Sequence, residues 1–174
     1  MNVKQKRLQR LVFSAMFCAV VFTATWISVP APGIGNVNLG DAAILLASWM
    51  LGGPWAAIAS GLGAALADLV SGYAVYAPAT FVIKALMVVA AVCIGRLGKK
   101  NQKAKALFRV FGAIAAELVM ITGYFLYESL VIGIGWAAIA SVPFNAAQGA
   151  IGIVLAMAAY ALLRRAGLSG EPRE

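Results

Sequence analysis

The amino-acid sequence predicts an all-α integral membrane protein with six transmembrane helices, and two observations support this prediction. The first is composition: 63% of the 174 residues are apolar, 11% are charged, and the mean hydropathy is +0.90. A soluble domain of this size could not bury so much apolar surface, because its outer layer would have to be apolar too. The second is that no polar linker divides the chain, so residues 1–174 form one transmembrane domain. The apolar runs lie at roughly 9–30, 41–52, 54–72, 78–96, 108–131 and 141–164.

The first three runs differ in what they predict. The apolar stretch 11–29 is as long as a bilayer span requires, so we expect an uncleaved first helix and not a signal peptide. The second run, 41–52, would be about 18 Å long as a helix and cannot cross a core of about 30 Å upright. Gly52-Gly53-Pro54 predicts a tight turn with proline in the first turn of the third helix. The second and third runs therefore form a helical hairpin with one short arm.

The basic residues predict the orientation of the bundle. The net charge is +8, and all basic residues except Lys84 flank the apolar runs in three segments: Lys4, Lys6, Arg7 and Arg10; Arg96, Lys99, Lys100, Lys103, Lys105 and Arg109; Arg164, Arg165 and Arg173. The loops on the other side, 30–40, 73–77 and 132–140, contain no Lys or Arg. Because cytoplasmic loops accumulate these residues, we expect both termini in the cytoplasm of a multi-pass cell-membrane protein. This distribution argues against nucleic-acid binding, which a basic soluble protein would suggest.

Segment 29–41, VPAPGIGNVNLGD, predicts an irregular external connection because it is rich in Pro, Gly and Asn. Irregular backbone near a membrane must pack on protein or face water. Two roles remain open at this stage. The segment is either a lid over a pocket or an ordered connector in which Asp41 is the N-cap of the next helix.

Two opposite charges lie inside the third and fourth runs. Asp68 and Lys84 have comparable predicted depths on helices joined by a hairpin, so an ion pair between them is geometrically available. A charge at the bilayer centre costs about 2.5–3.5 kcal/mol on insertion scales, so such residues face protein or a watery cavity. We favour structural pairing for Asp68 and contact with a polar ligand for Lys84.

The fifth and sixth runs carry further polar side chains. Glu117, Tyr124 and Glu128 are spaced by seven and four residues and share one helical face, with Glu128 near the external end, where it can be simply solvated. Asn145 and Gln148 are three residues apart and also share a face. Hydrogen bonds between helices are one explanation for such residues. The other is a site for a small polar molecule that enters from outside.

Several activities are excluded or disfavoured by the sequence. Histidine is absent, and Cys18 and Cys93 match no metal or redox spacing, so we expect no metal, no cofactor and no catalytic residue. The ATP-binding pattern GxxxxGK[ST] is also absent, so any ATP-driven transport takes its power from another subunit. An intramembrane aspartyl enzyme using Asp41 and Asp68 is an alternative, but GLGAALAD lacks the expected Gly-x-Gly-Asp arrangement. A stand-alone secondary transporter is a second alternative, although no inverted repeat is visible.

At a larger scale the sequence resembles a known family. The first run contains AMFCA (15–19), and the external loop ends in LGDA. LGGPWAAIASGLGAALADLVSGYAVYAPATFVIKAL follows, then GYFLYES in the fifth run and PFNAAQG opening the sixth. Together these segments resemble the substrate-binding S components of energy-coupling factor (ECF) transporters, in the riboflavin-transporter-like branch. The most specific part of the resemblance is residues 39–86.

The resemblance implies a function, partners and a site. S components of bacteria and archaea capture a vitamin outside the cell, dock on a membrane coupling protein (the T component) with two ATPases, and topple in the membrane to deliver it. In this chain, Ala15 and Ala19 would face the coupling protein. A pocket on the external side would be built from the first loop and the last three helices. The residues expected to contact the ligand are Lys84, Glu117, Tyr124, Asn145, Gln148, Asn36 and Asn38.

The ligand itself is predicted only by class. A pocket with few charges and two side-chain amides suits a small, flat or branched polar molecule. Hydroxymethylpyrimidine or pyridoxine is the first expectation, and pantothenate or riboflavin the next.

Overall fold

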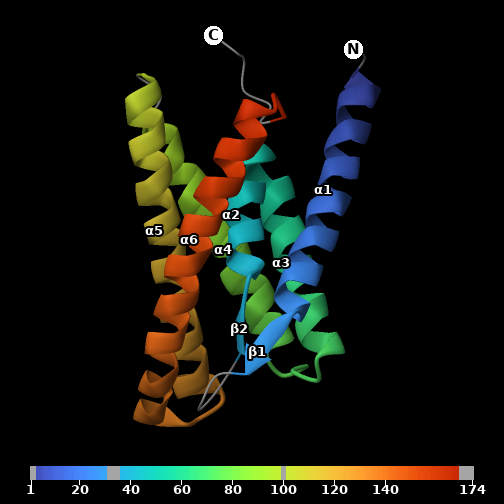
Figure 1. Ribbon diagram of the computed structural model, residues 1–174. Coiled ribbons are helices and arrows are strands. Elements are labelled where there is room, and N and C mark those ends of the chain that lie inside the picture. Colours follow the sequence, from blue (N-terminus) through green and yellow to red (C-terminus); the bar gives the residue numbers. More distant parts are fainter. Residues whose placement is uncertain (1–2, 31–35, 99–100, 169–174) are drawn as a thin grey trace.

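The computed structural model describes residues 3–30, 36–98 and 101–168, which fold into one bundle of helices with a small two-stranded ribbon (Figure 1). α1 begins and α6 ends at the same end of the bundle, and the ribbon lies at the opposite end (Figure 1). The elements, in chain order, are α1 (Val3–Trp26), β1 (Ser28–Pro30), β2 (Asn36–Asn38), α2 (Gly40–Met50), α3 (Gly53–Val70), α4 (Ala77–Gly95), α5 (Gln102–Leu126) and α6 (Val142–Arg165).

The predicted fold class is confirmed. Of the described helices, α1, α3, α4, α5 and α6 are long and apolar enough to cross a membrane. α2 has 11 residues and is therefore about 17 Å long, as its short apolar run predicted. The small β-ribbon is the one element that the prediction of an all-α protein did not include.

The short helix α2 lies inside the bundle. It packs against α1, α4 and α6, so other helices surround it on several sides (Figure 1). A helix with this environment is apolar around most of its circumference. Its buried residues are Gly40, Asp41, Ala43, Ile44, Leu45, Ala47 and Ser48. α2 is thus the core helix around which the longer helices are arranged.

The segment between α1 and α2 is more regular than its composition suggests. β1 and β2 pair in antiparallel register, with Ser28 opposite Asn38 and Val29 opposite Val37. The ribbon returns the chain to α1, where the Leu39 amide donates to the Ala24 carbonyl at 3.1 Å. The prediction of a wholly irregular segment was therefore wrong. The pairing depends on backbone hydrogen bonds, which residue preference alone does not reveal.

Asp41 is not the N-cap of α2, which was one of the two roles left open for this segment. The N-cap residue is Leu39, and no side chain caps it. Asp41 lies inside the first turn of α2 and is completely buried. An aspartate in this position needs a partner from another part of the bundle, because a buried unpaired charge is costly.

The turn between α2 and α3 agrees with its sequence. Gly52 and Gly53 have φ angles of 62° and 61°, in the left-handed region that side chains with a Cβ rarely adopt. Pro54 follows in the first turn of α3, where its missing N–H costs no helical hydrogen bond. The chain can therefore reverse direction without a longer loop.

The connection between α5 and α6 differs from the predicted loop 132–140. α5 continues through a π-helical turn, Tyr127–Val131, and a 3-10 helix, Gly135–Ser141, leads into α6. Glu128 is buried in this connection, where the Ser141 hydroxyl donates to its Oε2 at 2.6 Å. Solvation, one of the alternatives left open for Glu128, is therefore excluded, because the connection folds back over it.

α1 and α3 approach closely at a glycine. A Cβ added to Gly63 would lie 2.5 Å from the Cys18 carbonyl oxygen on α1. This atom belongs to the backbone and cannot move without shifting the helix. The side-chain hydrogen of glycine is therefore what allows the two helices to pack at this distance.

We predict that Gly63→Ala lowers the free energy of unfolding by about 1–3 kcal/mol, since the added methyl group forces α1 and α3 apart. Thermal unfolding in detergent measures the effect. Gly95→Ala is the matched control, because a Cβ there meets no atom within 4 Å. Equal stability of the two variants would contradict the close packing described for α1 and α3.

Candidate functional site

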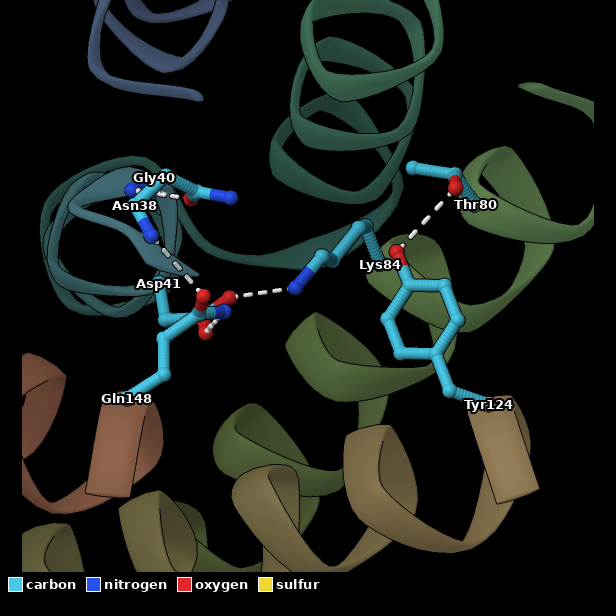
Figure 2. Close-up of polar contacts among 7 residues, drawn as sticks. All are labelled: Asn38, Gly40, Asp41, Thr80, Lys84, Tyr124 and Gln148. Carbon is cyan, nitrogen blue, oxygen red and sulfur yellow. Dashed lines mark hydrogen bonds and ion pairs between the residues drawn. The ribbon is translucent and has the colours of Figure 1, made fainter. Parts of the chain in front are cut away.

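A buried ion pair joins α2 to α4. The Lys84 Nζ lies 2.5 Å from the Asp41 Oδ1, and the two residues are 2% and 0% exposed (Figure 2). They are 43 positions apart in the sequence, so the pair ties together two distant parts of the chain. Each charge compensates the other in a part of the bundle with little access to water, where either alone would be unfavourable.

This pair corrects the predicted partner of Lys84. Asp68 was expected to pair with Lys84 across the α3–α4 hairpin, but Asp41 is the partner in the structure. Asp68 instead lies beside Thr80 on α4, and its Oδ2 is buried without a hydrogen-bond partner among the described residues. Asp68 was the expected partner of Lys84 because α3 and α4 are consecutive helices. The ribbon instead places the start of α2 inside the bundle, where Asp41 meets Lys84.

Gln148 extends the ion pair into a network of four elements (Figure 2). Its Nε2 donates to the Asp41 Oδ2 at 2.5 Å, and its Oε1 accepts from the Asn38 amide at 2.9 Å. The Asn38 side chain in turn accepts from the Gly40 amide at 2.9 Å. β2, α2, α4 and α6 are therefore linked by a continuous chain of polar contacts, which we call the polar network.

Tyr124 borders the polar network from α5. Its ring lies 5.4 Å from the Lys84 Nζ, within the range of a cation–π contact. Its hydroxyl group shares a hydrogen bond of 3.0 Å with Thr80 on α4 (Figure 2). These contacts fix the orientation of the ring next to the ammonium group.

Glu117 lies beside the polar network but makes none of its hydrogen bonds. It is only 4% exposed, and within the described chain neither carboxyl oxygen has a hydrogen-bond partner. It is close enough to Asp41 and Lys84 to interact electrostatically with both. On α6 it packs against Gly149, where an added Cβ would lie 2.8 Å from its Oε2. The bundle therefore buries this carboxyl group without satisfying it.

The other predicted residues are placed as follows. Asn145 is half-buried in the first part of α6, one turn before Gln148, and is outside the polar network of the described residues. Asn36 is in β2, but its side chain lies outside what the structure describes. Ala15 and Ala19 are exposed on α1. The structure thus brings Lys84, Gln148 and Asn38 into one network, with Glu117 and Tyr124 beside it.

Asp41 is the site residue that sequence reasoning missed. It was considered only as a helix cap or as half of an aspartyl pair. Its position at the start of an apolar run was a usable signal, since a charge buried there requires an opposite charge, and Lys84 is the only basic residue away from the ends of the apolar runs. Both Asp41 oxygens are occupied by Lys84 and Gln148, an arrangement unlike two carboxyl groups that share a proton.

The fold and this polar site match known membrane proteins. The family model "ECF-type riboflavin transporter, S component" matches residues 5–165. A thiamine precursor transporter, HmpT, of Lactococcus lactis is 29% identical over 94% of this chain and 92% of its own length. An uncharacterized protein from the gap 3' region of Pyrococcus woesei is 30% identical over 86% of this chain and 97% of its own length.

A solved structure supports the fold. The structure described as the S component of a bacterial ECF transporter superposes with a TM-score of 0.70. It covers 91% of this chain and 97% of its own, at 24% sequence identity. At this level of identity the likeness concerns the fold alone.

The chain is an S component, and it belongs to the ECF-type riboflavin transporter S-component family. It is therefore a multi-pass cell-membrane subunit of a vitamin transporter and not an enzyme. Membership implies a vitamin ligand and partners of the T-component and ATPase type. The resemblance inferred from the sequence is confirmed at the level of the family.

The ion pair predicts a strong energetic coupling between Asp41 and Lys84. Asp41→Asn or Lys84→Met alone leaves one buried charge uncompensated, which we expect to cost about 3–5 kcal/mol of unfolding free energy. The double variant removes both charges and is expected to lose much less than the sum. Thermal unfolding of the four proteins in detergent gives the double-mutant cycle. Strictly additive losses would contradict a direct pairing of these two side chains.

Proposed function

We propose that this S component captures a small, flat vitamin precursor of the hydroxymethylpyrimidine type outside the cell and delivers it by docking on a T component with two ATPases. The observation that carries the proposal is a polar network buried in an apolar bundle, with an unsatisfied Glu117 carboxyl group beside it. Buried polar groups without partners are rare in folded proteins, and they are frequent at sites that bind or react.

The charge of the site favours a ligand without a negative charge. Lys84 is neutralised by Asp41, so no basic side chain of the network remains to balance an anion. Pantothenate, which carries a carboxylate, fits this arrangement less well than hydroxymethylpyrimidine or pyridoxine. The similarity to a thiamine precursor transporter supports the first of these two, since hydroxymethylpyrimidine forms one half of thiamine.

The proposed orientation places the site on the external half of the bundle. The described basic residues other than Lys84 lie in the first turns of α1, at the end of α4 and the start of α5, and at the end of α6, and these segments lie at one end of the bundle (Figure 1). By the positive-inside rule that end is cytoplasmic. The ribbon, Asn38 and the start of α2 then face the exterior, so the ligand would enter beneath the ribbon.

The proposed ligand contacts come from three helices and the ribbon. Glu117 offers two free oxygens, and the Lys84 ammonium group has three protons, of which Asp41 accepts one. Tyr124 and Gln148 border the same region from α5 and α6, and Asn145 lies one turn before Gln148 on α6. Asn36 and Asn38 belong to the ribbon above it.

A ligand panel tests the proposed function. We expect hydroxymethylpyrimidine to raise the unfolding temperature of the detergent-solubilised protein more than pyridoxine, pantothenate or riboflavin, because binding to the folded state stabilises it. Calorimetry should then show that Asn145→Ala weakens binding by roughly tenfold through loss of one hydrogen bond.

The matched control for this variant is Asn101→Ala, which removes an amide from the opposite end of the bundle, where Asn101 caps α5. We expect it to leave the affinity unchanged. A wild-type protein that binds no vitamin in the panel would contradict the proposed function.

Docking is tested separately from binding. Ala15 and Ala19 are exposed on α1, and small residues allow another helix to approach closely. We predict that Ala15→Trp and Ala19→Trp abolish vitamin uptake by cells that contain the ATPase module, while calorimetry shows unchanged affinity. Ala161→Trp on the exposed face of α6 is the control. Normal uptake by both α1 variants would rule out this face as the docking surface, and uptake without any ATPase module would favour a stand-alone transporter.

A further inference from the structure

We propose that Glu117 determines ligand specificity by pairing both of its carboxyl oxygens with the edge of an aminopyrimidine, where a ring nitrogen lies next to an exocyclic amino group. This inference rests on the proposed function and specifies which feature of the ligand is recognised. The starting point is that Glu117 is 4% exposed and that neither oxygen has a hydrogen-bond partner in the described chain.

The polar neighbours of Glu117 make their hydrogen bonds with Asp41 and not with Glu117. Lys84 donates to Asp41, and Gln148 donates to the second Asp41 oxygen. On α6 the carboxyl group lies against Gly149, which has no side chain to offer. Within the described chain neither of these donors makes a hydrogen bond with Glu117, so both of its oxygens remain available to a ligand.

Charge balance restricts the chemistry of that partner. Lys84 and Asp41 contribute +1 and −1, so Glu117 and the ligand must together be close to neutral in this apolar surrounding. An aminopyrimidine keeps the pair neutral, because a single proton lies between the Glu117 carboxyl group and the ring nitrogen. Either the carboxylic acid donates to the neutral ring nitrogen, or the carboxylate accepts from the protonated ring. In both cases the amino group donates to the second oxygen, and the total charge is the same.

Other ligand classes satisfy this carboxyl group less well. An anionic ligand adds a negative charge that no side chain of the polar network balances. An alcohol has a single O–H donor, so it engages one oxygen and leaves the other buried without a partner, which is costly. Two parallel hydrogen bonds to a carboxyl group also fix the plane of the ligand, as in other bidentate pairs.

The test compares two ligands in two proteins by calorimetry. The ligands are 4-amino-5-hydroxymethyl-2-methylpyrimidine and the same molecule without its amino group. We expect wild-type protein to prefer the amino compound by roughly tenfold or more, since one of two strong hydrogen bonds is lost without it. Glu117→Ala is expected to bind both compounds weakly and with equal affinity. Glu117→Gln should keep part of the preference, because an amide also offers one donor and one acceptor.

Glu128→Ala is the matched control, because Glu128 is equally buried on the continuation of α5 but is hydrogen-bonded by Ser141. This variant should lose thermal stability and keep the wild-type preference. If folded Glu117→Ala and Glu117→Gln both retain the full preference for the amino compound, the inference is overturned while the proposed function stands. If wild-type protein binds riboflavin, pyridoxine or pantothenate but not the aminopyrimidine, both the inference and the proposed ligand fall, and vitamin capture remains.

Discussion

The ion pair between Asp41 and Lys84 is the interaction on which the rest of the site depends. It neutralises two charges inside a bundle that is otherwise apolar, and it fixes the short helix α2 against α4. Through Gln148 the same aspartate is tied to α6, and through Asn38 to the ribbon. The Asp41 carboxylate thus connects α2 to α4, α6 and, through Gln148, the ribbon. A buried pair of this kind adds little net stability, and its main effect is to define a single arrangement of the helices.

This arrangement is the basis of our proposal for how a very apolar protein recognises a polar vitamin. The network satisfies its own charges and leaves one carboxyl group, Glu117, available at its border. The glycine at position 149 lets α6 pass close to that group. Because the ribbon and the start of α2 take part in the same network, the two are connected by hydrogen bonds. Ala15 and Ala19 are exposed on α1 and take no part in this network, so the proposed ligand capture and the proposed docking use different residues.

Much of the fold could be predicted from the sequence, and the parts that could not have a common cause. Apolar run length gave the five long helices and the short α2, and Gly52-Gly53-Pro54 gave the turn, because these features are local. The partner of Lys84, the burial of Glu128 and the ribbon at 28–38 depend on contacts between segments far apart in the chain. Helical spacing placed Glu117 and Tyr124 on one face and Asn145 near Gln148. It could not predict that Asp41 pairs with Lys84, because that contact forms only when the ribbon brings α2 into the bundle.

Native mass spectrometry of the detergent-solubilised protein tests the central claim most directly, namely that this buried polar region binds a vitamin and is more than a structural tie. Wild-type protein mixed with hydroxymethylpyrimidine is predicted to carry one bound molecule. Folded Glu117→Ala, measured under the same conditions, is predicted to carry little or none. Equal occupancy of the two proteins, or a wild-type protein that stays free of every vitamin offered, would contradict the account.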